Sequence, residues 1–67
     1  EWQKECNYIA RVADRIARGA SVPEEFNGDR AVFIRYCEMQ RNSAEREGRD
    51  DSAQYIQHCI DDLETAP

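Results

Sequence analysis

The sequence lacks the features that mark a membrane protein or an enzyme. No apolar run approaches the roughly 18 residues that a membrane-spanning helix needs, and the first residues do not form a secretory signal segment. There is no glycine-rich phosphate loop, His-Glu-x-x-His pair or calcium-binding loop. The single histidine, His58, falls on the polar side of an expected helix, where no nucleophile faces it. We therefore expect no enzymatic activity, no cofactor and no membrane partner.

Cysteines are too few and too widely spaced for the disulfide framework of a secreted mini-protein. This spacing favours three reduced thiols that serve as small apolar side chains in a cytoplasmic protein, with one disulfide among them as the alternative. The three residues are Cys6, Cys37 and Cys59. Together with His58 they would supply four zinc ligands. However, no Cys-x-x-Cys pair exists, and His58 and Cys59 would point about 100° apart on a helix. The sequence thus predicts no metal site.

The net charge of −5 is confined to the last third of the chain. Residues 1–43 carry 7 basic and 7 acidic side chains, whereas residues 44–67 carry 2 basic and 7 acidic ones. A protein that wraps a nucleic acid normally has an excess of positive charge. This distribution argues against general nucleic-acid binding and leaves an acidic surface for another kind of partner.

Apolar residues recur at helical spacing in three segments, and no segment alternates as a strand would. The spacing predicts helices over 2–18, 30–47 and 51–64, with a short helical turn near 22–27. Residues 1–67 are therefore expected to form a single all-α domain, a compact three-helix bundle. Its predicted core consists of Trp2, Ile9, Val12, Ile16, Phe26, Val32, Phe33, Tyr36, Ile56, Ile60 and Leu63.

Several residues predict where these helices begin and end. Gly19 and Gly48 are suited to close the first two helices, because glycine accepts the left-handed conformation found at helix ends. Asp29 is expected to cap the second helix. The remaining caps are assigned to the Ser21–Glu24 capping box for the short turn and to Asp50 or Asp51 for the third helix.

Two features of the polar surface are candidates for binding a partner. On the second helix, Ile34 interrupts the polar side between Arg30 and Arg41, either as an ordinary exposed side chain or as the centre of a contact. Three carboxylates occupy the last turn of the third helix, where the helix dipole disfavours them. Because they do not serve helix stability, we expect Asp61, Asp62 and Glu64 to serve solubility or a partner.

These patterns predict a small acidic cytoplasmic protein-binding module that occupies a surface of a larger protein. It would act as an accessory, adaptor or inhibitor, as small proteins of bacteria and their phages do. One alternative is a nucleic-acid-binding regulator that acts as a dimer and uses a basic strip on the first helix. In the other interpretation of this strip, it is an ordinary solvated face. Its residues are Lys4, Arg11, Arg15 and Arg18. The other alternative is a structural homodimer component, because so small a core would gain stability from a second copy.

Overall fold

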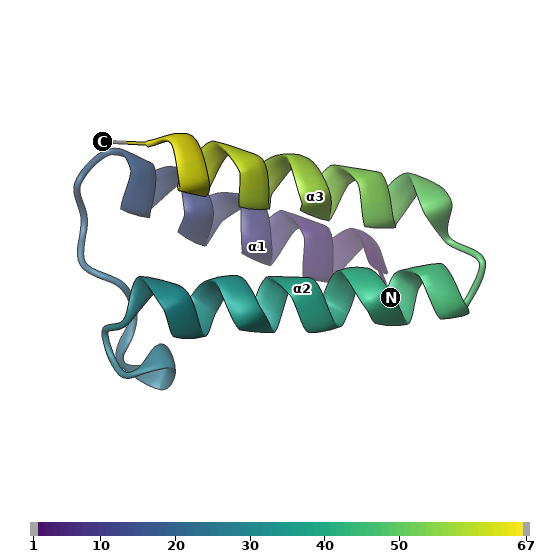
Figure 1. Cartoon of the computed structure of the whole chain (residues 1–67), viewed down its shortest axis with the longest axis horizontal. Coiled ribbons are helices and arrows are strands. Elements are labelled where there is room, and N and C mark those ends of the chain that lie inside the picture. The colour runs from purple at the N-terminus through teal and green to yellow at the C-terminus, as the bar shows by residue number, and fades with distance from the viewer. Residues whose placement is uncertain (1, 67) are drawn as a thin grey trace.

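The computed structural model describes residues 2–66, which form three α-helices and one short 3₁₀ turn. The helices are α1 (Trp2–Ala17), α2 (Arg30–Arg46) and α3 (Asp50–Thr65), and the turn η1 (Glu24–Phe26) lies between α1 and α2 in the chain. Helices α1 and α3 run in the same direction, and α2 runs opposite to both (Figure 1). Residues 2–66 contain no strand. The predicted all-α three-helix bundle is therefore confirmed.

Helix α3 packs along both other helices, whereas α1 and α2 have few direct backbone contacts. The turn η1 contacts both α1 and α2. Its buried Phe26 ring lies 5.0 Å from the ring of Phe33 and 5.2 Å from that of Tyr36, both on α2. On the other side, the Tyr8 hydroxyl of α1 donates a hydrogen bond to Glu25. This turn consequently joins two helices that touch little by themselves.

Two further hydrogen bonds from aromatic side chains connect α1 to α2. The Trp2 indole Nε1 donates to Glu47 Oε1 at 2.8 Å, and the Tyr36 hydroxyl donates to the Glu5 carboxylate. Together with the Tyr8 bond to η1, these hydrogen bonds provide polar contacts along the seam where α1 meets α2 and η1. The seam between α1 and α2 thus combines aromatic packing with carboxylate acceptors.

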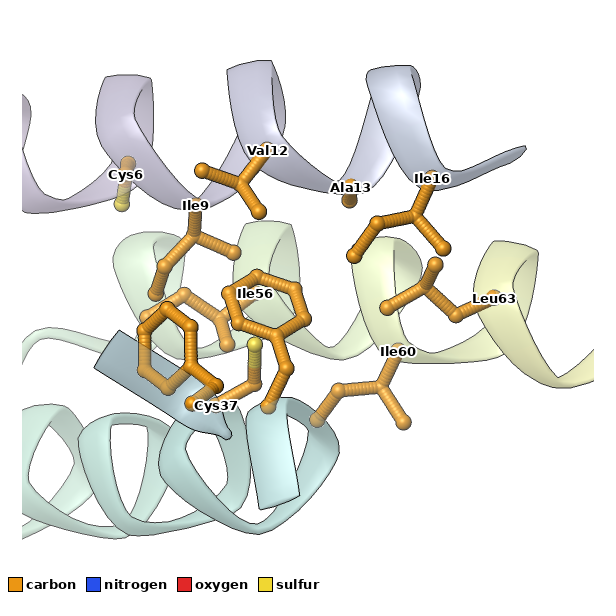
Figure 2. Close-up of a cluster of buried hydrophobic side chains, with 11 residues drawn as sticks. Cys6, Ile9, Val12, Ala13, Ile16, Cys37, Ile56, Ile60 and Leu63 are labelled. Atoms are coloured by element: carbon orange, nitrogen blue, oxygen red, sulfur yellow. The ribbon is translucent and has the colours of Figure 1, made fainter. Parts of the chain in front are cut away.

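A single hydrophobic core holds the three helices together (Figure 2). Of the predicted core residues, Trp2, Val32 and Tyr36 are only partly buried and pack against its edge. Its buried members are Cys6, Ile9, Val12, Ala13, Ile16, Phe26, Phe33, Cys37, Ile56, Ile60 and Leu63. All three cysteines are free, and two of them occupy the core as small apolar groups.

The helix bounds agree with the predicted ranges to within one residue, and η1 is shorter than expected. Asp29 caps α2 as predicted, since its Oδ1 accepts from the Ala31 amide at 2.9 Å. Two other capping predictions are wrong. Pro23 and Arg49 are the N-caps of η1 and α3, and neither makes a side-chain capping bond.

The predicted caps of η1 and α3 have other positions in the structure. Ser21 lies before Pro23, outside the 3₁₀ turn, so no capping box forms. Asp50 and Asp51 both fall inside the first turn of α3, close to the positive end of the helix dipole. The Asp51 carboxylate pairs there with Arg49 Nη2 at 3.3 Å, and that hydrogen bond lowers its pKa. An ion pair has replaced the expected capping bond.

Removing the one side-chain cap that the structure confirms should destabilise the protein. We expect Asp29→Ala to lower the free energy of unfolding by roughly 0.5–2 kcal/mol, because the Ala31 amide loses its acceptor. Urea denaturation followed by circular dichroism measures the loss. Ser21→Ala is the matched control and should change nothing, since Ser21 caps no helix. Equal stability of the two variants would contradict the assigned cap.

Candidate functional site

Five of the six residues predicted to bind a partner lie where α2 packs along α3. We call this surface the α2/α3 face; it comprises Arg30, Ile34, Arg41, Asp61 and Glu64. Hydrogen bonds join its two helices at both ends. Arg30 Nη1 donates to the Leu63 carbonyl at 3.2 Å, and Arg41 Nη1 donates to Gln57 Oε1. The sixth residue, Asp62, lies on the other flank of α3, beside α1.

Arg30 stabilises the C-terminal end of α3. The last carbonyls of any helix lack intrahelical partners, and the helix dipole places partial negative charge there. The half-buried Arg30 supplies both a donor and a positive charge at this end. The Thr65 hydroxyl bonds to two more carbonyls, those of Asp61 at 3.1 Å and Asp62 at 3.3 Å. A cation from α2 therefore compensates for the absence of basic residues in the last turn of α3.

Arg41 begins a chain of hydrogen bonds that ends at a carboxylate. Gln57 accepts from Arg41 and donates through Nε2 to Asp61 Oδ1 at 2.9 Å. Arg41 also donates through Nη2 to Asn42 Oδ1 at 3.1 Å. Beside this chain lies a shallow groove of about 460 Å³ between the helices. Its lining residues are Arg41, Glu45, Asp50, Ala53, Gln54 and Gln57.

The prediction that Ile34 projects from the polar side of its helix is wrong. Ile34 is half-buried and packs against the hydrophobic core. Met39, on the other flank of the same helix, is 65% exposed. The reason for the burial of Ile34 is that α3 covers its flank of α2: Arg30 and Arg41, the neighbours of Ile34 on the helix surface, both donate hydrogen bonds to α3. Ile34 therefore contributes at most an apolar edge to the α2/α3 face.

The carboxylates of this face have no cationic partner among residues 2–66. Asp61 and Glu64 are exposed, and neither forms an ion pair with a described residue. Arg30 and Arg41 lie nearby, but their guanidinium groups bond to a backbone carbonyl and to side-chain amides instead. The Asp61 and Glu64 carboxylates therefore remain available as acceptors, while the neighbouring arginine side chains are already held by other hydrogen bonds.

On its other flank, α3 forms a groove with α1 that the sequence reasoning missed. This α1/α3 groove has a volume of about 340 Å³. It is lined by Ala10, Ala13, Asp14, Ala17, Tyr55, His58, Cys59 and Asp62. Tyr55 lies in this groove with 46% of its surface exposed. Three alanines at helical spacing on α1 were the available signal, but spacing alone does not show which helix faces them.

The basic strip on α1 is exposed as its spacing predicted. All four members, Lys4, Arg11, Arg15 and Arg18, lie on the solvent side of the helix. Arg18, the first residue after α1, pairs with Asp14 at 3.0 Å, four residues earlier in the chain. The other three form no ion pair with any residue of the described range 2–66. The strip is thus a real positive surface, partly neutralised at its C-terminal end.

The thiols are poorly placed for nucleophilic chemistry. Burial raises the pKa of Cys37 to about 12, and burial followed by the charge of Asp62 raises that of Cys59. Because the thiolate is the reactive form, neither cysteine resembles an activated nucleophile. Within residues 2–66, no cluster of histidine, cysteine and carboxylate side chains could hold a metal ion. No helix in this range is long and apolar enough to cross a membrane.

The geometry thus offers three surfaces: the α2/α3 face, the α1/α3 groove and the basic strip. Comparison with known proteins adds no functional assignment to any of them. The chain matches no protein-family model, and neither the curated proteins nor the solved structures contain a significant match to it.

Proposed function

We propose that this chain is a small protein-binding module, an adaptor, accessory or inhibitor, whose α2/α3 face binds a basic surface of a larger protein. One observation carries the proposal. Asp61 and Glu64 are exposed without an ion pair in the described range, although two arginines of α2 lie beside them and bond elsewhere. Carboxylates at this end of a helix oppose its dipole, so their presence is better explained by a partner than by stability.

The face is also held in a fixed arrangement before any partner arrives. Gln57 connects Arg41 to Asp61, and Arg30 is tied to the end of α3. A binding surface whose side chains are already ordered loses less conformational entropy when it associates. The net charge of −5 would additionally speed the encounter with a positively charged protein.

A cytoplasmic location is part of the proposal. Three free cysteines, two of them in the core, suit a reducing compartment, in which thiols persist without pairing. A positively charged protein of the same compartment is the partner expected there.

The proposal predicts that reversing the two carboxylates abolishes binding. The wild-type chain and the variant Asp61→Lys/Glu64→Lys serve as baits in native lysate from cells that express the protein, with nuclease added. We expect a stoichiometric protein on the wild-type bait alone, and the purified pair should bind about tenfold or more weakly after the double substitution. Lysine also suits the C-terminal end of a helix, so the variant should remain folded.

A matched control separates the α2/α3 face from overall charge. The double variant Glu24→Lys/Asp62→Lys changes the net charge equally, at exposed positions outside the α2/α3 face whose side chains make no described ion pair. It should keep most of the binding. Equal capture by wild type and Asp61→Lys/Glu64→Lys would overturn the proposal. Capture that disappears with nuclease would instead support the alternative, a nucleic-acid-binding regulator that uses the basic strip on α1.

A further inference from the structure

We propose that the basic strip on α1 binds an acidic segment of a second protein, which presents a single row of carboxylates to it. The strip lies on the outer side of α1, because the buried side chains of this helix point toward the rest of the bundle (Figure 2). The proposal goes beyond the binding of a basic protein, since it uses a surface turned away from the α2/α3 face. The two surfaces can therefore be tested separately.

Three cations of the strip have no acceptor in the described part of the chain. Lys4, Arg11 and Arg15 are exposed, and none of them makes an ion pair or a side-chain hydrogen bond with a residue of the range 2–66. Four arginines elsewhere, in contrast, each donate to an acceptor of the fold. They are Arg30, Arg41, Arg46 and Arg49. Positive charge that the fold leaves free is therefore gathered mainly on α1.

The spacing of these cations does not stabilise the helix that carries them. Arg11 and Arg15 are four residues apart, where two like charges repel each other on a helix surface. Asn7 lies three residues after Lys4 and four before Arg11, so a carboxylate at this position would pair with both. The sequence has a neutral amide there instead. As with the acidic turn of α3, the charge is better explained by a partner than by stability.

Carboxylates border the strip on both sides and limit the width of its partner. Asp14 lies on the flank toward α3, where it lines the α1/α3 groove. On the other flank Tyr8, a neighbour of Arg11 on the helix surface, donates its hydroxyl hydrogen bond to Glu25 of η1. A duplex nucleic acid or an anionic membrane laid on α1 would meet these carboxylates as well as the cations. The net charge of −5 would also repel such a polyanion at longer range.

A single row of carboxylates fits between the two borders. Lys4, Arg11 and Arg15 lie within about 40° of one another around α1 and extend over about 17 Å along it. Guanidinium groups bind carboxylates through two parallel hydrogen bonds, which favours the two arginines as the centre of the contact. An acidic protein segment supplies such a row without the dense charge of a nucleic acid. Charge complementarity and the width of the strip thus point to the same class of partner.

Titration with a synthetic acidic peptide tests the proposal. The probe is a helical peptide of about 18 residues that carries glutamates every three to four positions along one face. At low ionic strength it should shift the amide NMR signals of Lys4, Arg11 and Arg15 in the full chain, with a Kd below about 1 mM. Added salt should weaken the complex, because exposed charges are screened. The variant Arg11→Gln/Arg15→Gln should bind the peptide about tenfold more weakly.

A matched control separates the strip from overall charge. Arg35→Gln/Arg46→Gln changes the net charge equally at exposed positions of α2 and should keep the binding. Asp61→Lys/Glu64→Lys should also keep it, so failure of this proposal and failure of the α2/α3 face can be told apart. Equal loss in the two glutamine variants would overturn the proposal, as would no binding at about 1 mM peptide. Tighter binding of a DNA duplex or of anionic lipid vesicles at the same salt concentration would overturn it too, and would assign the strip to that partner.

Discussion

Replacing Phe33 with alanine should leave most of the chain unfolded at room temperature. Phe33 is fully buried, and its ring packs against that of Phe26, the only buried residue of η1. A Phe→Ala substitution in a core costs about 3–5 kcal/mol through lost burial and the cavity left behind. A single core below about 70–80 residues rarely supplies more than 3–5 kcal/mol in total. The expected loss therefore equals the whole stability of the domain.

Circular dichroism at increasing urea concentration measures this effect. We expect wild type to unfold cooperatively and Phe33→Ala to show little helical signal even without denaturant. Met39→Ala is the matched control, because Met39 lies on the same helix but is 65% exposed, and it should change the stability by no more than about 0.5 kcal/mol. If Phe33→Ala unfolds cooperatively at nearly the urea concentration of wild type, Phe33 does not hold the three helices together.

The helices and most of the core could be predicted from sequence because both depend on local spacing. On α1 and α3, apolar residues recur every three to four positions, and each set forms one stripe that must be buried. Ile9, Ile16, Ile56, Ile60 and Leu63 are buried as that spacing predicts. Cys37 of α2 is buried for the same reason. A stripe of this kind indicates which side of a helix is buried. A chain with only three helices has few arrangements that bury all of these sides together.

What covers the two flanks of each stripe could not be predicted. Ile34 and Met39 lie on opposite flanks of α2, and only the position of α3 decides that the first is packed and the second exposed. Asp61 and Asp62 are adjacent in sequence, yet α2 borders one and α1 the other. The parallel register of α1 and α3, which exposes Tyr55, is likewise a property of packing. Sequence reasoning therefore located the acidic turn but grouped Asp62 with Asp61 and Glu64, although Asp62 lies on the other flank of α3.

Stability should fall steeply at alkaline pH, because folding raises the pKa of two thiols and two tyrosine hydroxyls, those of Cys37, Cys59, Tyr8 and Tyr36. Burial raises the pKa of Cys37 from an ordinary 9.0 to about 12. Burial and the hydrogen bond to Glu25 raise that of Tyr8 from 10.0 to about 12, and burial with the bond to Glu5 raises that of Tyr36. Above pH 9 the unfolded chain therefore releases protons that the folded chain still holds.

The sign of this linkage is fixed by which state binds more protons. All four groups contribute their full stabilisation below about pH 9, and the contributions of Cys37 and Tyr8 are lost as the pH rises toward their folded pKa values near 12. The raised pKa values of Cys59 and Tyr36 act in the same direction. A group that titrates only in the unfolded chain lowers the free energy of unfolding by about 1.4 kcal/mol per pH unit. With 3–5 kcal/mol as the approximate total, we expect cooperative unfolding by about pH 11.

Urea denaturation between about pH 7 and pH 10.5 measures the slope, and two variants identify its source. Tyr36→Phe should be less stable at pH 7 by roughly 0.5–1.5 kcal/mol, because the bond to Glu5 is lost, but its stability should fall less steeply above pH 10. Tyr55→Phe should follow the wild type, since Tyr55 bonds to no described residue. A free energy of unfolding that stays constant over this range would mean that the Tyr8 and Tyr36 hydroxyls and the Cys37 thiol are not sequestered by the fold. The polar contacts that join α1 to η1 and α2 would then have no part in its stability.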